Sequence, residues 1–313
     1  MRQLKEGRDA GLRRSFFQKG WYRMEMNAQG KTKKRRNDCL ANLLQVSLMY
    51  AVLILFALCF VIPFVFMFLG SFKLPSELFR VPFKWLPDQF MLANYQAVFT
   101  EIPFLRYLQN TLIIVVANIG GTVISSSLVA YGFSRLQWPG RDKVFILVLI
   151  TMILPYQVTL VPLFLLYTKL GWVGTFLPLT ITHFFGNPFY IFLLRQFYIS
   201  VPMELSYAAR VDGAGEFRIY STIVMPLMKP ALATVAIFTF IRAWHDFIGP
   251  LVFLGNDKLY TLSLAASMLY SEKDPRWNIL FALGVLMVAP VLLIFFLLQK
   301  YFIQGISMSG LKG

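Results

Sequence analysis

The residues in this sequence that are most able to take part in chemistry are ionisable side chains inside an otherwise apolar stretch. Arg242, His245 and Asp246 lie within residues 230–256, beside Trp244. A charge at the centre of a bilayer costs about 2.5–3.5 kcal/mol even on insertion scales, so these groups should face other helices or a polar cavity. Arg242 and Asp246 are four residues apart and can pair on one helix face. Two hypotheses remain: a structural pair that joins helices, or the lining of a permeation path.

Other apolar runs hold isolated polar residues that are weaker candidates for the same path: Asn118, Gln157, His183 and Asn187. The sequence has 2 histidines and no spacing typical of a zinc site, a Ser/His/Asp set or paired carboxylates. Glycines and Lys312 near the C-terminus stand in the wrong order for a phosphate-binding loop. We therefore predict a chain that is not an enzyme and binds no metal or cofactor of its own.

The elements that must position these residues are long apolar segments. Of the 313 residues, 57% are hydrophobic and 14% are charged. A bilayer core is crossed by about 20 helical residues, and lipid offers no hydrogen bonds to bare strands. We predict an all-α integral membrane protein with six transmembrane helices. Five come from runs without Asp, Glu, Lys or Arg, and the sixth is the less clean stretch 230–256; the five runs are 39–72, 107–134, 144–168, 170–194 and 277–299.

The formal net charge of +15 does not indicate a nucleic-acid partner, because 12 of the 30 Lys/Arg residues lie in residues 1–42. The positive-inside rule places this end in the cytoplasm. Six crossings then return the C-terminus and the loop 197–229 to the same side. We divide the chain into a basic tail (1–41), a membrane domain (42–302) and a C-terminal tail (303–313). The basic tail either lies disordered near anionic lipid or forms a surface helix or partner contact.

Small residues and prolines predict how the helices pack. Gly120–Gly121 and Ser125–Ser127 would let neighbouring helices approach closely in lipid. Prolines interrupt the third and fourth crossings, which indicates bent helices around a cavity; they are Pro155, Pro162, Pro178 and Pro188.

A polar segment, residues 204–230, is wedged between two apolar runs. Glu204 suits the first turn of a helix, where the dipole favours an acid. Ala208 and Ala209 are strong helix formers with little bulk, so another protein could approach closely. Asp212-Gly213 would end the helix, because glycine adopts the left-handed conformation that a reversal needs. The segment predicts a short docking helix at the membrane surface.

The order Ala208-Ala209, Gly213, Ile223 and Met225-Pro226 resembles the signature loop of ATP-binding-cassette importer permeases. Further similarity to the maltose-type branch covers about residues 43–313. It is carried by Trp85-Leu-Pro, Asn94-Tyr95, Asn110-Thr111, the segment 130–135, Pro139-Gly140-Arg141, Pro155-Tyr-Gln-Val-Thr, Trp244-His-Asp-Phe and Gly305–Gly313.

This resemblance implies a type I importer permease that forms half of a translocation path in a bacterial inner membrane. The implied partners are a second homologous permease, two ATPase subunits that hold ATP and Mg, an extracytoplasmic solute-binding protein, and a carbohydrate, with an oligosaccharide expected. The resemblance assigns ATPase coupling to Glu204, Tyr207, Ala208, Ala209, Asp212, Gly213, Ala214, Phe217 and Pro226. It assigns the interface between the ATPase subunits to Gly310, Lys312 and Gly313, against the alternative of a tail without a role.

Three positions depart from the family pattern. Tyr207 stands where the family usually has a glutamate, Met225 replaces a leucine and His245 replaces an asparagine. The loss of the glutamate puts one ion pair to the ATPase in doubt, not the docking itself. Two alternatives remain: an ion-driven secondary transporter with Arg242 and Asp246 as its ion site, or a membrane-embedded enzyme that acts on lipid-linked sugars.

Overall fold

A computed structural model describes residues 42–43, 45–271 and 275–310, with side chains up to residue 299. The chain divides into two units, residues 1–66 and 67–313. The first unit contains most of an apolar helix, Gln45–Gly70, whose side chains are largely exposed, as suits a helix surrounded by hydrocarbon.

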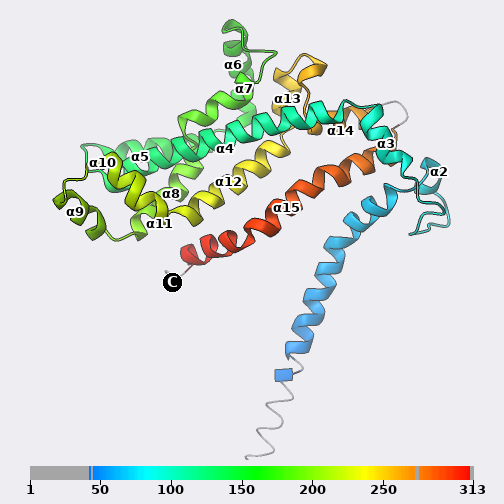
Figure 1. The fold of residues 1–313 in the computed structure, drawn as a ribbon, viewed down its shortest axis with the longest axis horizontal. Coiled ribbons are helices and arrows are strands. Elements are labelled where there is room, and N and C mark those ends of the chain that lie inside the picture. The colour runs from blue at the N-terminus through cyan, green and yellow to red at the C-terminus, as the bar shows by residue number, and fades with distance from the viewer. Residues whose placement is uncertain (1–41, 44, 272–274, 311–313) are drawn as a thin grey trace, which may run out of the picture. The chain divides into compact units, whose positions relative to one another are not determined.

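The described residues of the second unit form helices and connecting segments without β-strands (Figure 1). Its first half consists of α2 (Pro75–Leu78), α3 (Ala93–Thr100), α4 (Phe104–Arg135), α5 (Arg141–Ile150), η1 (Thr151–Ile153), α6 (Tyr156–Lys169), α7 (Leu177–Thr180), η2 (Ile181–Phe185) and α8 (Pro188–Ser200). Its second half consists of α9 (Glu204–Val211), α10 (Glu216–Arg218), the π-helix η3 (Ile219–Val224), α11 (Met225–Leu227), α12 (Lys229–Trp244), α13 (Ile248–Phe253), η4 (Asp257–Leu259), α14 (Leu262–Ser271) and α15 (Trp277–Gly310).

The predicted crossings are present, although not all are continuous. Among the described residues, 4 helices are long and apolar enough to span a membrane: Gln45–Gly70, Phe104–Arg135, Leu177–Ser200 and Trp277–Gln299. Two bent pairs raise the number to 6 if each is one span. The first pair, Arg141–Ile153 and Tyr156–Lys169, bends by 95°, and the second, Glu216–Leu227 and Lys229–Trp244, bends by 80°. The all-helical membrane fold is therefore confirmed, with irregular backbone inside several spans.

Prolines explain the breaks, but not every proline produces one. Leu154 is extended (φ −73°, ψ 116°) because the ring of Pro155 disfavours a helical residue before it. Pro178 and Pro188 lie in the first turns of α7 and α8, where a missing N–H is harmless. Pro162, expected to interrupt the third crossing, lies inside α6 without ending it.

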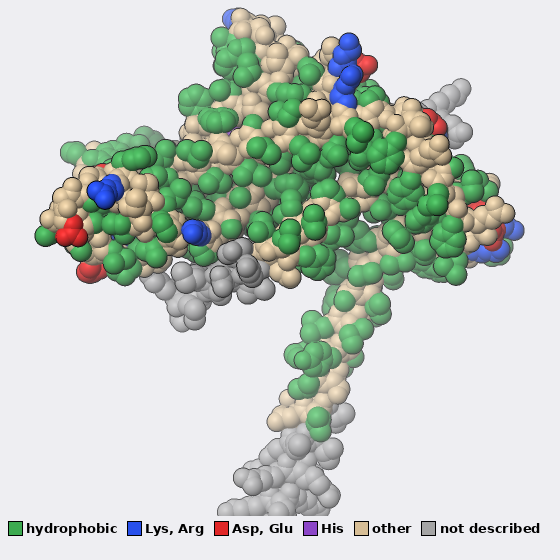
Figure 2. Space-filling model, viewed as in Figure 1, with side chains coloured by type: hydrophobic (Ala, Val, Ile, Leu, Met, Phe, Trp, Pro, Cys, Tyr) green, Lys and Arg blue, Asp and Glu red, His purple; other side chains and the backbone are tan. Residues whose placement is uncertain are grey.

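The long helix α4 is the centre of the second unit, since it packs against α8, η2 and α12, and α12 packs in turn against α15 (Figure 1). Of the two glycines predicted to allow close approach, Gly121 does so where α4 meets η2, whereas Gly120 faces open space. A Cβ added at Gly121 would lie 2.9 Å from the ring of Phe184. Figure 2 shows hydrophobic side chains spread over the whole visible face of this unit with few charged side chains among them, as expected for a surface in contact with lipid.

Serine side chains of α4 form hydrogen bonds with backbone groups that are left free where the fourth crossing is interrupted. The Ser125 hydroxyl donates to the carbonyl of His183 at 2.9 Å, and the Ser126 hydroxyl accepts from the Asn187 amide at 3.1 Å. Lipid cannot supply these hydrogen bonds. The serines therefore make a non-helical turn possible at membrane depth.

At its other end, α4 is joined to the segment before α14 through Asn110. The Asn110 amide nitrogen donates to the carbonyls of Lys258 and Tyr260 at 2.9 and 3.0 Å. We expect Asn110→Leu to leave both carbonyls without this donor and to lower the free energy of unfolding by about 1–3 kcal/mol. Chemical unfolding of the purified protein in detergent measures the change. Gln109→Leu, at the exposed neighbouring position, is the matched control and should leave stability unchanged; equal stability of both variants would contradict the assignment.

Candidate functional site

The polar segment after α8 folds as the predicted helix and turn. α9 runs from Glu204 to Val211 and ends with Gly213 in the left-handed conformation (φ +80°). The Ala214 amide donates to the Ala209 carbonyl at 2.9 Å, and the Gly213 amide donates to the Arg210 carbonyl at 3.0 Å. This pair of bonds is the Schellman arrangement that closes a helix C-terminus. The predicted helix break at Asp212-Gly213 is confirmed.

The two faces of α9 differ in character. Ser206 and Ala209 are buried, with Ala209 in the apolar core of the domain. Tyr207 and Ala208 are exposed, and Val211 is 88% exposed. Of the two alanines expected to let another protein approach closely, Ala208 is exposed, whereas the helix turns Ala209 inward. The remaining sequence candidates for coupling divide in the same way: Glu204, Asp212, Gly213, Phe217 and Pro226 are exposed, and Ala214 is half-buried.

A line of polar contacts joins this helix to α4. Arg210 Nε donates to Glu216 Oε1 at 2.7 Å, and the Tyr131 hydroxyl donates to Glu216 Oε2 at 2.9 Å. The hydrogen bond to Glu216 raises the pKa of Arg210, which therefore stays charged. The Arg210 guanidinium also lies over the Tyr207 ring, 5.6 Å from its centroid. Sequence reasoning missed the link between Tyr131 and Glu216, since no spacing relates positions that are 85 residues apart. It also missed the ion pair of Arg210 with Glu216, 6 residues further along the chain.

A second contact holds the chain that leads into α9. Arg135, at the end of α4, is 2% exposed. Its Nη2 donates to the Val201 carbonyl at 2.6 Å, and its Nη1 lies 3.4 Å from the Pro202 carbonyl and 2.9 Å from Met203 Sδ. The guanidinium thereby fixes three successive residues of the entry to α9.

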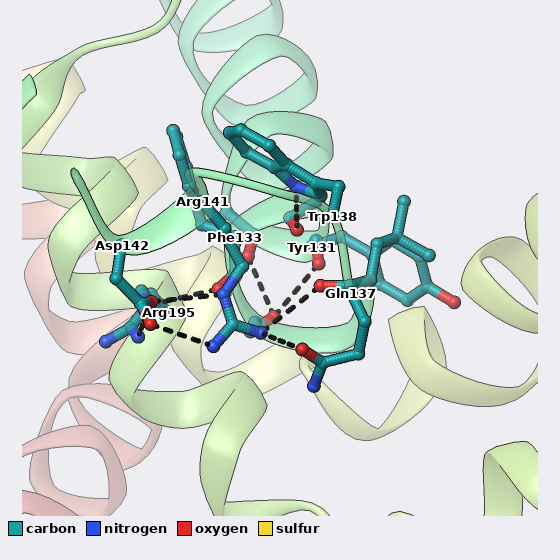
Figure 3. A network of polar contacts seen from close by, with 11 residues as sticks. Tyr131, Phe133, Gln137, Trp138, Arg141, Asp142 and Arg195 are labelled. Atoms are coloured by element: carbon teal, nitrogen blue, oxygen red, sulfur yellow. Dashed lines mark hydrogen bonds and ion pairs between the residues drawn. The ribbon is translucent and has the colours of Figure 1, made fainter. Parts of the chain in front are cut away.

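The turn between α4 and α5 is tied to α8 by a further network (Figure 3). Arg195 of α8 donates to the Phe133 carbonyl at 3.2 Å and lies 3.7 Å from Asp142, and its guanidinium covers the Phe145 ring at 4.3 Å. Arg141 donates to Asp142 Oδ1 at 3.1 Å. Asp142 is largely exposed, so the ion pairs contribute little, and the packed Arg195 side chain carries more of the stabilisation.

An open cleft of about 480 Å³ separates this turn from α9. Polar groups and two aromatic rings line it, which suits a protein surface better than lipid; the lining consists of Arg135, Leu136, Gln137, Trp138, Met203, Tyr207, Arg210 and Glu216. The segment predicted to couple to an ATPase is thus a short helix with exposed apolar side chains and a cleft beside it.

The predicted path residues are only partly brought together. A cavity of about 180 Å³ is lined by Asn118, His183, Arg242 and Asp246, among others. The predicted pairing of Arg242 with Asp246 is wrong for the described chain. α12 ends at Trp244, so Asp246 leaves the helix face and its Oδ1 accepts from the Gly249 amide at 3.1 Å instead.

The other path candidates have local roles. Trp244 is buried and donates through Nε1 to the Met287 carbonyl at 3.1 Å. His245 is exposed and its Nδ1 lies 3.0 Å from the Ile241 carbonyl. Asn187 caps α8 by accepting from the Phe189 amide at 3.0 Å. Gln157 is exposed on α6.

Two further predictions concern the C-terminal tail and metals. α15 continues to Gly310, past the expected end of the membrane domain at residue 302, while Lys312 and Gly313 lie outside the described residues. Within the described ranges, no group of three or more His, Cys, Asp or Glu could hold a metal ion.

Comparison with known proteins identifies the family. Residues 121–308 match the family described as "Binding-protein-dependent transport system inner membrane component". The chain belongs to this family. It is therefore a membrane permease of a transport system, as the loop resemblance predicted, and neither the ion-coupled transporter nor the lipid-linked sugar enzyme finds support in these comparisons.

The relatives extend over most of the chain. The arabinooligosaccharides transport system permease AraQ of Bacillus subtilis is 33% identical over 264 residues, 82% of this chain and 92% of that protein. The diacetylchitobiose uptake permease NgcG of Streptomyces coelicolor is 31% identical over 84% of this chain and 88% of that protein. Among solved structures, a bacterial ABC transporter for import of the polysaccharide alginate matches with a TM-score of 0.74 at 25% identity, covering 82% of this chain and 96% of that chain.

The Tyr131–Glu216 hydrogen bond gives a test of how the loop is held. We expect Tyr131→Phe to remove this bond without changing the packed ring, and to lower the free energy of unfolding by about 0.5–1.5 kcal/mol. Hydrogen exchange of residues 204–218 should rise as α9 loosens. Tyr198→Phe is the control, because it removes a hydroxyl bonded to Ser127 from the same aromatic cluster. If both variants loosen α9 equally, the Tyr131 hydroxyl has no special role there.

Proposed function

We propose that this chain is one permease subunit of an ATP-driven, binding-protein-dependent importer of a carbohydrate, with an oligosaccharide as the expected cargo. The observation that carries the proposal is the exposed helix–turn α9 to Gly213 in a chain of this permease family. The names of the relatives support the substrate class, since they specify arabinooligosaccharides, diacetylchitobiose and α-glucosides.

The partners in this proposal are a second homologous permease, two ATPase subunits and an extracytoplasmic solute-binding protein. The ATPase subunits hold ATP and Mg, so this chain takes no catalytic part in hydrolysis. The basic N-terminal tail and the positive-inside rule support a cytoplasmic location of both termini and of the loop 197–229. The tail residues Gly310, Lys312 and Gly313 would then lie on the ATPase side of the membrane.

The proposed mechanism is a two-state switch. The ATPase subunits bind the exposed face of α9, and their closure on ATP moves this helix. Arg135 holds the entry to α9 and Tyr131 holds Glu216 beyond its turn, so a displacement of α9 is passed to α4 at two points. The bundle changes between inward-open and outward-open states, provided that ATP and the loaded binding protein each favour one of them.

The substrate class is tested on the assembled complex in nanodiscs. We expect ATP hydrolysis to rise several-fold when the binding protein carries one of three neutral sugars: arabinotriose, diacetylchitobiose or maltose. sn-Glycerol 3-phosphate is the comparison, because a permease for this anion is 27% identical to the chain. Stimulation by the anion alone would contradict the carbohydrate assignment, and persistence of transport with the ATPase subunits removed would contradict the mechanism.

The docking surface is tested at Val211, whose side chain is 88% exposed in the chain alone. We expect Val211→Asp to reduce co-purified ATPase more than about tenfold, because an unpaired charge would be buried at the interface. Val211→Thr keeps the shape without the charge and is the matched control. The thermal stability of the isolated subunit should not change in either variant. Full ATPase recovery with Val211→Asp would exclude this face of α9 from the interface.

A further inference from the structure

The segment between the apolar helix Gln45–Gly70 and α4 exposes many large apolar side chains. Its two short helices, α2 and α3, lie at one end of α4 (Figure 1). Apolar side chains that are scattered singly over a surface are normal, but a dense group of them marks a contact surface. Within residues 79–92, six are each at least 50% exposed: Phe79, Val81, Trp85, Leu86, Phe90 and Leu92.

Buried polar contacts hold this segment in one shape. The Asn94 side-chain nitrogen donates to the carbonyls of Ser71 and Lys73, both at 2.9 Å, and Asn94 Oδ1 accepts from Asn278 of α15 at 2.7 Å. Lys73 is itself buried, and its ammonium donates to the Lys84 carbonyl. The exposed apolar side chains therefore project from a segment that is fixed to the helix bundle.

The charged side chains of the segment neutralise one another. Asp88 accepts from Arg80 at 3.2 Å and from Lys84 at 2.8 Å. The Asp88 amide donates to Glu77 Oε2 at 3.3 Å, which brings a second acid to the same place. Two basic and two acidic side chains thus balance, so this surface has little net charge with which to attract an ionic partner. Contact with a partner must come mainly from the apolar side chains.

The backbone of the segment needs water while its side chains avoid water. The amides of Val81 and Leu86 donate to no backbone carbonyl of the described residues. Such amides are costly in hydrocarbon, where nothing replaces the missing acceptor. The interfacial layer of a bilayer supplies water to the backbone and an apolar medium to the side chains, and aromatic residues are enriched there.

The position of the segment in the chain places it at this layer. It follows a membrane-spanning helix that ends at Gly70, and it leads into α4, which begins at Phe104. Exposed apolar side chains continue from Phe99, which is 49% exposed, to Leu105, which is 69% exposed. Leu105 in turn belongs to an open apolar groove along the first turns of α4. The apolar surface of the segment is therefore continuous in the chain with a surface that faces lipid.

We propose that residues 79–92 form a membrane-interface anchor whose partner is the lipid surface itself. Val81, Leu86 and Phe90 enter the boundary between headgroups and acyl chains, and the Trp85 ring lies beside them. The contact is apolar and does not depend on the charge of the headgroups. Because Asn94 joins the segment to α15, the anchor fixes the depth of this end of the bundle. This role adds to the proposed transport function and is independent of the cargo.

The test measures the depth of single spin labels in the complete complex, reconstituted in nanodiscs with cysteine-free partner subunits. Cys39→Ser and Cys59→Ser give the background, and Val81→Cys, Leu86→Cys or Gln89→Cys then carries one label. Gln89 is the matched control, since it is an exposed polar residue of the same segment. Collision of each label with oxygen, which concentrates in the bilayer, is compared with collision with a water-soluble nickel chelate. Val81 and Leu86 are exposed, so a label there displaces no packed neighbour.

We expect the labels at Val81 and Leu86 to favour oxygen over the chelate by about threefold or more, and the label at Gln89 to favour the chelate. The result should be the same in phosphatidylcholine alone and with phosphatidylglycerol added, because the segment's charges balance. A depth that depends on the anionic lipid would contradict the apolar contact. Equal behaviour of all three labels would contradict the anchor, because the segment would then lie wholly in hydrocarbon or wholly in water.

A protein partner on this surface gives a different result. Protection of the Val81 and Leu86 labels from both reagents would mean that another subunit covers the segment, and it would overturn the proposal. In the proposed orientation, the solute-binding protein docks on this side of the membrane. Protection that appears only when the loaded binding protein is added would assign the surface to that protein instead of lipid. We expect the binding protein to leave both collision rates within about twofold.

Discussion

The constraint on which this structure depends is that lipid cannot hydrogen-bond to a peptide group. Continuous helices meet this constraint by themselves, but the spans of this chain are broken at several places. Each break therefore needs donors and acceptors from a neighbouring helix. Ser125 and Ser126 of α4 supply them for the turn between η2 and α8. Without these bonds, the backbone groups at the breaks around the cavity would have no hydrogen-bond partners at membrane depth.

Helix α4 connects the two candidate sites. Asn118 lies at the cavity, and Tyr131 and Arg135 lie at the loop, 13 and 17 residues further along the same helix. At about 1.5 Å per residue, these distances are about 20 and 26 Å. In the proposed mechanism, α4 moves as one packed body, so a displacement of α9 would be passed along it to the cavity lining.

The loop combines a rigid attachment with an open surface. Two polar anchors, Arg135 and the Tyr131–Glu216 bond, hold it on its inner side, and Ala209 packs into the core. Its outer side has few contacts within the chain and exposes Val211 and Phe217. A helix with this division can transmit a displacement, because the anchors would resist independent movement. Tyr207, which replaces the usual glutamate, instead lies beneath the Arg210 guanidinium, so its ring contributes packing within the loop itself.

The sequence by itself determined the membrane class, the helical fold and the short helix that ends at Asp212-Gly213. Uncharged runs long enough to span a bilayer admit few other structures, and a helix that ends in Asp212-Gly213 follows from local conformational preference. Only the tertiary structure decided which side chains meet. It took Asp246 off the helix face of Arg242 because α12 ends at Trp244, and it turned Ala209 inward. It also joined Tyr131 to Glu216 and brought Asn118 to the lining of a cavity, because such contacts depend on how distant helices pack and leave no periodic signal in the chain.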